Sequence, residues 1–203
     1  ILVVAWGGLG GGEPAPCGYG YGAYAGDDEV GGDDDDDEAG EDDTGPANPC
    51  SALDEHFEPS WSDYEEEVLE RTNERRAEGA DCGVHGWFDP APPLTMDPDL
   101  RLAARRHSWH MGVENYFDHD SPDGPCGDDF VERIEAAGYL GWGAAGENIA
   151  AGHTSPQAVV DGWMDSDGHC ANIMDPVFAE IGIGFAQVPQ SSYSAYWTQD
   201  FGG

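Results

Sequence analysis

The feature that most constrains folding is a break in composition near residue 60. Residues 1–60 contain 16 of the chain's 42 acidic side chains, 13 of its 30 glycines and no arginine. Their densest stretch, residues 27–43, has twelve acidic side chains in seventeen positions. Such a segment cannot bury enough apolar surface to offset the entropy lost on ordering, so we predict a disordered acidic tail over residues 1–60. The folded domain is expected over residues 61–203.

The formal net charge of -35 narrows the range of partners. All seven basic residues are arginines, and they lie within residues 61–203. A chain this acidic repels phosphate backbones and anionic headgroups, so we expect no nucleic-acid partner. The domain alone has 26 acidic residues against those seven arginines, so the exclusion does not depend on the tail.

The first six residues, ILVVAW, are either the remnant of a signal peptide or a short apolar tag. No stretch approaches the 18 or so apolar residues of a membrane span. A signal remnant would fit a secreted or cell-surface protein, and we expect a monomer without a transmembrane segment.

Five cysteines leave at least one without a partner inside the chain. They are Cys17, Cys50, Cys82, Cys126 and Cys170. None forms a CxxC pair, which argues against a structural zinc knuckle. A Cys82–Cys170 disulfide is one candidate and would close a loop of nearly ninety residues. The sequence alone leaves the connectivity open.

Two helices are expected in the first half of the domain. Ser62-x-x-Glu65 has the spacing of a capping box and predicts a helix that ends near Gly79. Asp97 followed by Pro98 predicts the start of a second helix, which ends near Tyr116.

The second half predicts two more helices and a hairpin. One helix runs from about Asp129 to Gly138, and another begins at Ser155-Pro156. Residues 180–188 and 193–201 have the patterns of two strands joined by a turn. Helices first and strands last predict an α+β domain with an antiparallel sheet.

Three polar stretches carry the candidate functional residues. They place His119 within residues 117–124, Glu147 within 146–152, and His169 with Glu180 within 166–182. Two imidazoles and one or two carboxylates could converge on Zn²⁺ or another divalent cation. The same residues could instead form a hydrogen-bonded cluster without a metal.

These stretches lead to a family resemblance. The strings RRHSWHM, YFDHDSPDG, GENIAAG, GWMDSDGHCANIM, FAEIGIGFA and YWTQDFG follow one another over about residues 62–203. In this order they resemble the bacterial branch of the CAP superfamily, which comprises the cysteine-rich secretory, antigen 5 and pathogenesis-related 1 proteins. These are also called SCP-like extracellular domains.

The resemblance implies an α-β-α sandwich with a central antiparallel sheet, usually exported. It also implies a cleft lined by two histidines and two glutamates. His119 matches the first histidine, Glu147 the first glutamate and His169 the second histidine. This chain has Asp-Ser-Asp at 165–167, where the family's second glutamate is expected. Glu180 could replace it from the neighbouring strand.

The resemblance favours a secreted domain that acts by binding rather than by turnover. Its unknown extracellular ligand could be a lipid or another small molecule, with His119, His169 and Glu147 holding a divalent metal. An enzyme is less favoured, because no nucleophile–base pair is evident. One alternative is a metal-dependent peptidase or esterase that uses the same cleft. Another is a surface protein whose acidic tail binds cations.

Overall fold

The computed structural model describes residues 49–121 and 123–203. The predicted tail up to residue 48, the apolar segment 1–6 and Cys17 lie outside these residues. The main sheet has the strand order β3-β5-β6-β4. Its strands are β3 (Thr95–Met96), β4 (Ala145–Ala151), β5 (Glu180–Gln187) and β6 (Ala195–Gly202). Neighbouring strands are antiparallel except for the short β3, which runs parallel to β5.

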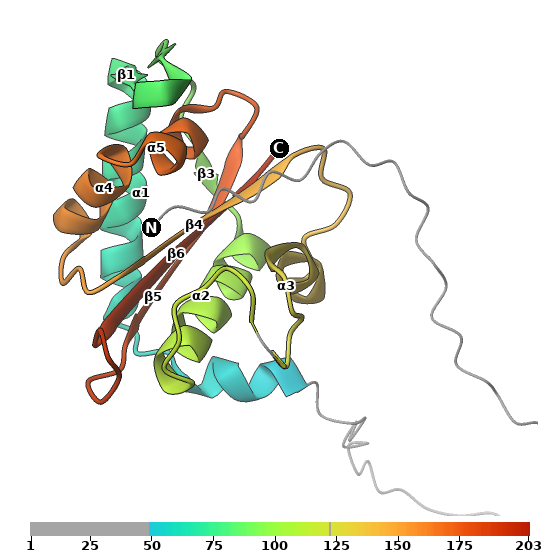
Figure 1. Ribbon diagram of the computed structural model, residues 1–203. Coiled ribbons are helices and arrows are strands. Elements are labelled where there is room, and N and C mark those ends of the chain that lie inside the picture. Colours follow the sequence, from blue (N-terminus) through green and yellow to red (C-terminus); the bar gives the residue numbers. More distant parts are fainter. Residues whose placement is uncertain (1–48, 122) are drawn as a thin grey trace, which may run out of the picture. The chain divides into compact units, whose positions relative to one another are not determined.

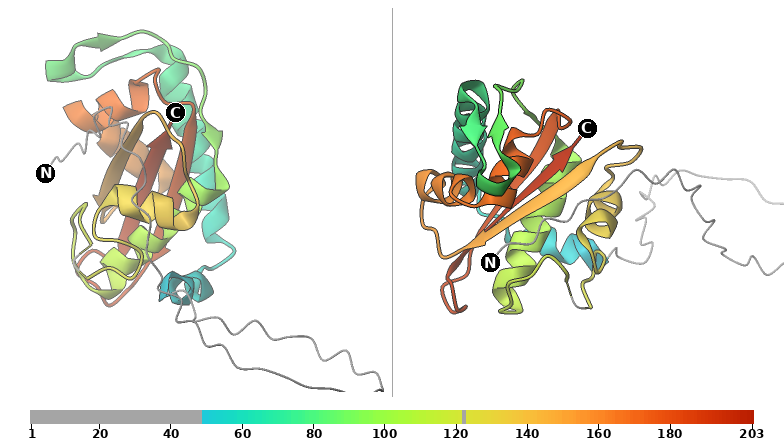
Figure 2. Two further views of the ribbon diagram at one scale, coloured as in Figure 1. Left: turned by 90° about the vertical axis from the view of Figure 1, so that its right-hand side faces the viewer. Right: turned by 45° about the horizontal axis from the view of Figure 1, so that its top comes forward.

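Helices cover both faces of the sheet (Figure 1). Helices α2 (Pro98–Val113) and α3 (Phe130–Ala137) lie on one face, and α1 (Trp61–Glu78), α4 (Pro156–Met164) and α5 (Asp167–Met174) lie on the other. The two further views in Figure 2 show the same three layers. The predicted α-β-α sandwich is therefore confirmed.

Short elements complete the domain. The 3-10 helix η1 (Pro49–His56) contacts α2 and lies before the domain start expected at residue 61. The two-stranded sheet of β1 (Ala80–Asp81) and β2 (Trp87–Phe88) encloses the 3-10 turn η2 (Gly83–His85).

Local signals in the sequence placed several helix ends correctly. The Asp97 carboxylate accepts hydrogen bonds from two backbone N–H groups at the start of α2, each at 2.9 Å. Asp129 caps α3 through the N–H of Glu132 at 2.9 Å. The helix ends at Gly138, whose left-handed φ of 113° strongly favours glycine.

The capping-box prediction at the start of α1 was wrong. The helix begins at Trp61, so Ser62 and Glu65 lie within it. The Ser62 hydroxyl accepts from Arg105 at 2.9 Å, and the buried Glu65 carboxylate accepts from Arg101 at 2.8 Å. Glu65 also accepts from the backbone N–H of Phe185 at 3.3 Å. These residues therefore tie α1 to α2 and β5 rather than capping a helix.

Two elements near the candidate residues were not predicted. Residues 145–151, for which no strand was predicted, form the edge strand β4, and His169 lies within helix α5, for which no helix was predicted. Strand β4 is buried on both sides over almost its whole length, so it lacks the alternation of a half-exposed strand.

Two glycines of β5 let α2 approach the sheet closely. A Cβ added at Gly182 would stand 2.0 Å from the carbonyl carbon of Leu100, and one at Gly184 would stand 2.2 Å from that of Ala104. Both distances are far below van der Waals contact. The backbone of α2 therefore lies directly on the strands, and this brings His107 of α2 close to Glu147 of β4.

Candidate functional site: two histidines at an edge strand

The candidate site is organised by two successive residues of β4 that point to opposite faces of the sheet. Glu147 pairs in register with Asp200 of β6 and faces α2 and α3. Asn148 pairs with Gln199 and faces α5. All four side chains are almost completely buried.

The Glu147 carboxylate has a partner on each oxygen. Its Oε1 lies 2.7 Å from Nδ1 of His119, and its Oε2 accepts from Nη2 of Arg133 at 2.7 Å. Nε2 of His107 lies 3.9 Å from the same Oε2. A buried carboxylate is tolerated when it is paired and hydrogen-bonded in this way.

Electrostatics keep Glu147 charged and His107 neutral. Burial alone would raise the pKa of Glu147, but the charge of Arg133, with smaller contributions from His107 and His119, outweighs it and holds this pKa well below its usual range. Burial and the charge of Arg133 lower the pKa of His107 to about 3. At neutral pH the charged pair here is therefore Glu147 and Arg133.

Asp200 is a second buried carboxyl group beside Glu147. Burial and the charge of Glu147 raise the pKa of Asp200 well above its usual range. Among the described residues, no N–H or O–H group donates to either Asp200 oxygen. Burial beside the charged Glu147 therefore favours the protonated form of Asp200. The two acids differ in protonation because Arg133 bonds directly to Glu147.

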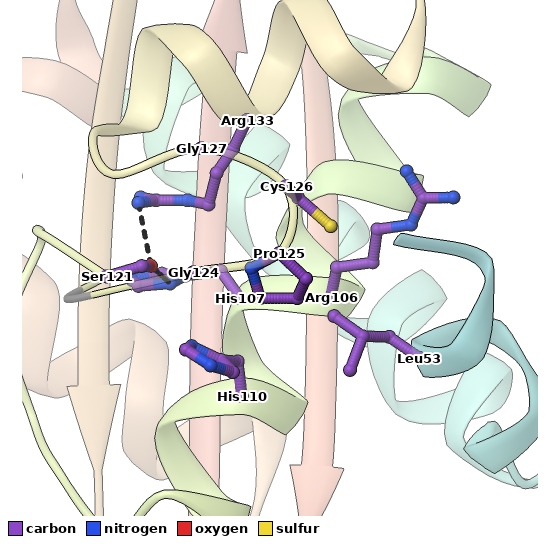
Figure 3. Close-up of a pocket in the computed structure, with 10 residues that line it drawn as sticks. All are labelled: Leu53, Arg106, His107, His110, Ser121, Gly124, Pro125, Cys126, Gly127 and Arg133. Carbon is purple, nitrogen blue, oxygen red and sulfur yellow. Dashed lines mark hydrogen bonds between the residues drawn. The ribbon is translucent and has the colours of Figure 1, made fainter. Parts of the chain in front are cut away.

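Ser121 extends this network toward the surface. Its hydroxyl accepts from Arg133 Nη1 at 3.1 Å and from Tyr116 at 3.0 Å, and it lies 3.2 Å from Nδ1 of His107. Figure 3 shows Arg133 reaching Ser121 beside a small cavity of about 10 Å³. Because Arg133 bonds both Ser121 and Glu147, it ties the loop that carries His119 to β4.

On the other face, neutral amides hold His169. The Asn148 side chain donates to the backbone carbonyl of His169 at 3.2 Å and to Gln199 at 3.1 Å. Asn172 donates to Asn148 at 3.0 Å, and Gln199 donates to Thr72 at 3.0 Å. This amide ladder joins α1, α5, β4 and β6 without a charged side chain.

A disulfide holds the same helix from its other side. Cys82 and Cys170 are bonded, with their Cα atoms 5.4 Å apart and both side chains buried. This confirms the predicted pair. Cys170 directly follows His169, so the disulfide and Asn148 fix the histidine backbone from two directions.

The His169 side chain borders a groove of about 340 Å³ beside β4. The groove is lined mainly by apolar and aromatic side chains, with three imidazole or hydroxyl groups: Phe117, Ile149, Ala150, Ala151, Trp163 and Tyr193, with His153, Ser166 and His169. Burial and the nearby His119 imidazole lower the pKa of His169 to about 4, so it is neutral at pH 7. Among the described residues, its buried Nε2 has no hydrogen-bond partner.

The structure brings only some of the predicted site residues together. His119 and Glu147 are directly bonded, and His169 lies across the edge strand, close enough for His119 to affect its pKa. Glu180 lies at the start of β5, two strands from β4, where it accepts from the hydroxyl of Tyr139 at 2.7 Å. It is therefore not part of the group around Glu147.

The predicted three-residue metal set does not fit this arrangement. Both oxygens of Glu147 already have hydrogen-bond partners inside the domain. Among the described residues, no three side chains of His, Cys, Asp or Glu are grouped to hold a metal. His119 and His169 are the pair that could contact a cation, with Glu147 orienting His119 as carboxylates orient metal-bound histidines.

Sequence reasoning missed Arg133, Asp200 and Ser121. A signal for Arg133 was present, because it falls on the inward face of α3, one turn from Phe130 and Ala137. Asp200 gave no comparable signal. Its position opposite Glu147 is set by the register between β4 and β6, and β4 was not expected as a strand.

Comparison with known proteins agrees with this fold. The model of the cysteine-rich secretory protein family (CAP) matches residues 69–201, and the chain belongs to this family. A crystal structure of an extracellular SCP-domain protein from Bacillus anthracis str. Ames superposes with a TM-score of 0.56. It is 29% identical and covers 71% of this chain and 43% of its own.

Two Bacillus subtilis (strain 168) proteins are also similar. The uncharacterized protein YkwD is 39% identical over 143 residues, which is 70% of this chain and 48% of YkwD. The uncharacterized membrane protein YlbC is 28% identical over 153 residues, or 75% of this chain and 38% of YlbC. This chain therefore spans less than half the length of either relative. In the part that the structure describes, no helix is both long and apolar enough to cross a membrane.

Proposed function

We propose that this CAP domain acts outside the cell by binding a neutral, largely apolar ligand in the groove beside β4. The observation that carries the proposal is the buried Nε2 of His169, which has no partner among the described residues and belongs to a residue that borders a mostly apolar groove. Ligand sites usually combine an apolar lining with a few placed polar groups, and about 340 Å³ falls at the small end of their usual size. The extracellular SCP-domain protein from Bacillus anthracis supports the location.

The net charge of the domain determines which headgroup an apolar ligand can carry. The domain has 26 acidic residues against seven arginines, so its field disfavours an anionic headgroup. His169 is neutral at pH 7 and offers a hydrogen bond rather than a charge. A hydroxyl group at the end of an alkyl chain fits both conditions, whereas the acidic field disfavours a carboxylate.

Calorimetric titration of the full chain with 1-decanol and with decanoate tests this proposal. We expect 1-decanol to bind at least tenfold more tightly than decanoate at low salt. His169→Gln should weaken 1-decanol binding roughly tenfold, as expected when one hydrogen bond is lost. Ala151→Phe should abolish binding by filling the groove.

The matched control is His85→Gln, because His85 is exposed on η2 and does not border the groove. Equal affinity for the alcohol and the carboxylate would contradict the charge argument. Unchanged 1-decanol binding in Ala151→Phe would show that the groove is not the site.

A second candidate is a divalent cation held by the imidazoles of His119 and His169. It is supported by the same unpartnered Nε2 and by the attractive field of the domain. Zinc titration in excess calcium, which occupies weak acidic sites, should detect it. We expect binding to be lost in His119→Ala/His169→Ala and weakened about 10–100-fold in Glu147→Gln. Zinc binding that survives the double variant would exclude these histidines.

The two alternatives from the sequence stay predictions. A peptidase and esterase screen with an EDTA control tests the hydrolase. The cation-binding tail was predicted over residues 1–60, and residues 1–48 of it lie outside the described residues. Deleting residues 1–48 before measuring calcium-dependent self-association tests it.

A further inference from the structure

We propose that Cys50 and Cys126 form a second disulfide, which fastens η1 to the loop that carries His119 and Ser121. The loop spans residues 114–129, between α2 and α3. The inference rests on the proposed extracellular location, because disulfides persist in oxidising compartments.

The two thiols are adjacent and share a hydrogen bond. Cys50 donates from Sγ to the backbone carbonyl of Pro125 at 3.3 Å, which places it beside the residue that follows, Cys126. The side chain of Cys126 is hydrogen-bonded to that of Cys50. Since the Cys50 hydrogen points to Pro125, Cys126 is the donor of the thiol–thiol bond. The two sulfur atoms are therefore close enough to share a hydrogen bond.

Contacts that do not involve sulfur hold this arrangement. Arg106 of α2 makes a two-pronged ion pair with Asp54 of η1, with both bonds at 2.8 Å. Figure 3 shows the Cys126 side chain beside Arg106, with Leu53 of η1 also lining this small cavity. Because Arg106–Asp54 already docks η1, forming the disulfide needs little further ordering.

Burial makes this pair structural rather than a switch. Cys50 and Cys126 are 2% and 7% exposed, and burial raises the pKa of the Cys126 thiol to about 12. A thiolate is the attacking species in disulfide exchange, so Cys126 is nearly inert once the domain has folded. The disulfide should therefore form during folding, before burial is complete.

The oxidant is a low-molecular-weight disulfide such as oxidised glutathione. One cysteine thiolate attacks it, which breaks the oxidant's S–S bond, forms a mixed disulfide and releases one thiol. The second cysteine then displaces the other thiol and completes the Cys50–Cys126 bond. Two electrons and two protons pass from the protein to the two released thiols.

Each candidate histidine would then lie close to a disulfide. Cys170 follows His169 directly, and Cys126 lies in the loop that carries His119. Four of the five cysteines would be paired, leaving Cys17 as the odd thiol.

Peptide mapping of the full chain, refolded with reduced and oxidised glutathione, tests the pairing directly. The product is denatured without reductant, alkylated, digested and analysed by mass spectrometry. We expect one linked peptide with Cys50 and Cys126 and another with Cys82 and Cys170, while Cys17 is alkylated. Alkylated Cys50 and Cys126 beside an intact Cys82–Cys170 link would overturn the proposal, and that second link shows that oxidation has worked.

Thermal melting gives an independent readout. Cys50→Ser, Cys126→Ser and the double variant should all melt about 5–15 °C below the wild type without reductant, since each removes the same bond. Melting within about 1 °C of the wild type in all three would contradict the disulfide. Mapping and melting do not measure ligand binding, so failure of the binding proposal would leave this test unaffected.

Discussion

Glu147 and Asn148 are neighbours in the chain, yet they organise opposite faces of the sheet by different means. Glu147 lies among Arg133, Asp200 and His119, where charge and an added proton balance two buried acids. Asn148 belongs to a ladder of neutral amides. On the charged face, which is the side of the sheet toward α2 and α3, both oxygens of the Glu147 carboxylate have hydrogen-bond partners. On the neutral face, which is the side toward α5, the Asn148 amide holds only the backbone of His169.

This difference explains why His119 and His169 are not equivalent. His119 is committed to Glu147 through Nδ1, while the His169 ring has a buried nitrogen without a partner among the described residues. The charged face therefore holds the ring of His119, whereas the neutral face holds the backbone of His169 and not its Nε2.

The largest expected effect comes from breaking the charge balance. Arg133→Met would leave the Glu147 carboxylate buried beside Asp200 without a cation, and breaking such a pair costs about 3–5 kcal/mol of unfolding free energy. Urea denaturation measures this loss. A loss below about 1 kcal/mol would mean that the pair is not buried as described.

The pH dependence of stability should come next. The folded-state pKa values of His107 and His169, about 3 and 4, lie below the usual value of about 6.5. Their contribution is full above pH ~6.5 and is lost as the pH falls toward those values. Asp200, with its raised pKa, opposes this, because its contribution is greatest below about pH 4 and is lost as the pH rises.

In Asp200→Asn, the free energy of unfolding should therefore fall more steeply as the pH is lowered than it does in the wild type. As the pH falls toward about 4, the usual pKa of an aspartate, each unit of acidification should cost the variant up to roughly 1.4 kcal/mol more than the wild type, because one compensating proton is absent. Urea unfolding at several pH values checks the slopes. Parallel slopes would show that Asp200 is ionised in the folded state.

Disrupting the neutral ladder should cost less than breaking the ion pair. Asn148→Ala removes the hydrogen bond to the His169 carbonyl and leaves Asn172 and Gln199 partly unsatisfied, which costs about 1–3 kcal/mol. Hydrogen exchange measured by NMR should show that the backbone amides of α5 lose more protection in the variant than those of α2, which would place the effect on the α5 side of the sheet. Equal loss of protection on both faces would contradict the separation of the two networks.

The smallest effect is expected for a surface pair. Arg75 lies 2.7 Å from Asp161, but their side chains are 39% and 43% exposed. Arg75→Met should change stability by at most about 1 kcal/mol, since water and salt screen exposed pairs. Arg75→Met is the matched control for Arg133→Met. If both variants lost a comparable free energy of unfolding, burial could not be the reason for the large effect expected at Arg133.

Sequence reasoning succeeded where the signal was local. The caps at Asp97 and Asp129 and the final hairpin could be predicted from neighbouring residues. The resemblance identified His119, Glu147 and His169 as site residues, but it could not show that both oxygens of Glu147 have hydrogen-bond partners inside the domain. Asp200 required the register of two strands, one of them hidden by burial on both sides.

The use of the arginines has a consequence for how copies of the protein meet in solution. All seven already have partners within the domain: Arg71 with Glu67, Arg75 with Asp161, Arg76 with backbone carbonyls, Arg101 and Arg105 with Glu65, Arg106 with Asp54, and Arg133 with Glu147. With no lysine in the chain, few cationic groups remain to attract another copy. Two molecules should therefore repel each other most strongly in dilute salt, because screening is weak there and the repulsion between like charges extends over tens of ångströms. A protein partner would have to supply the positive charge for its own docking.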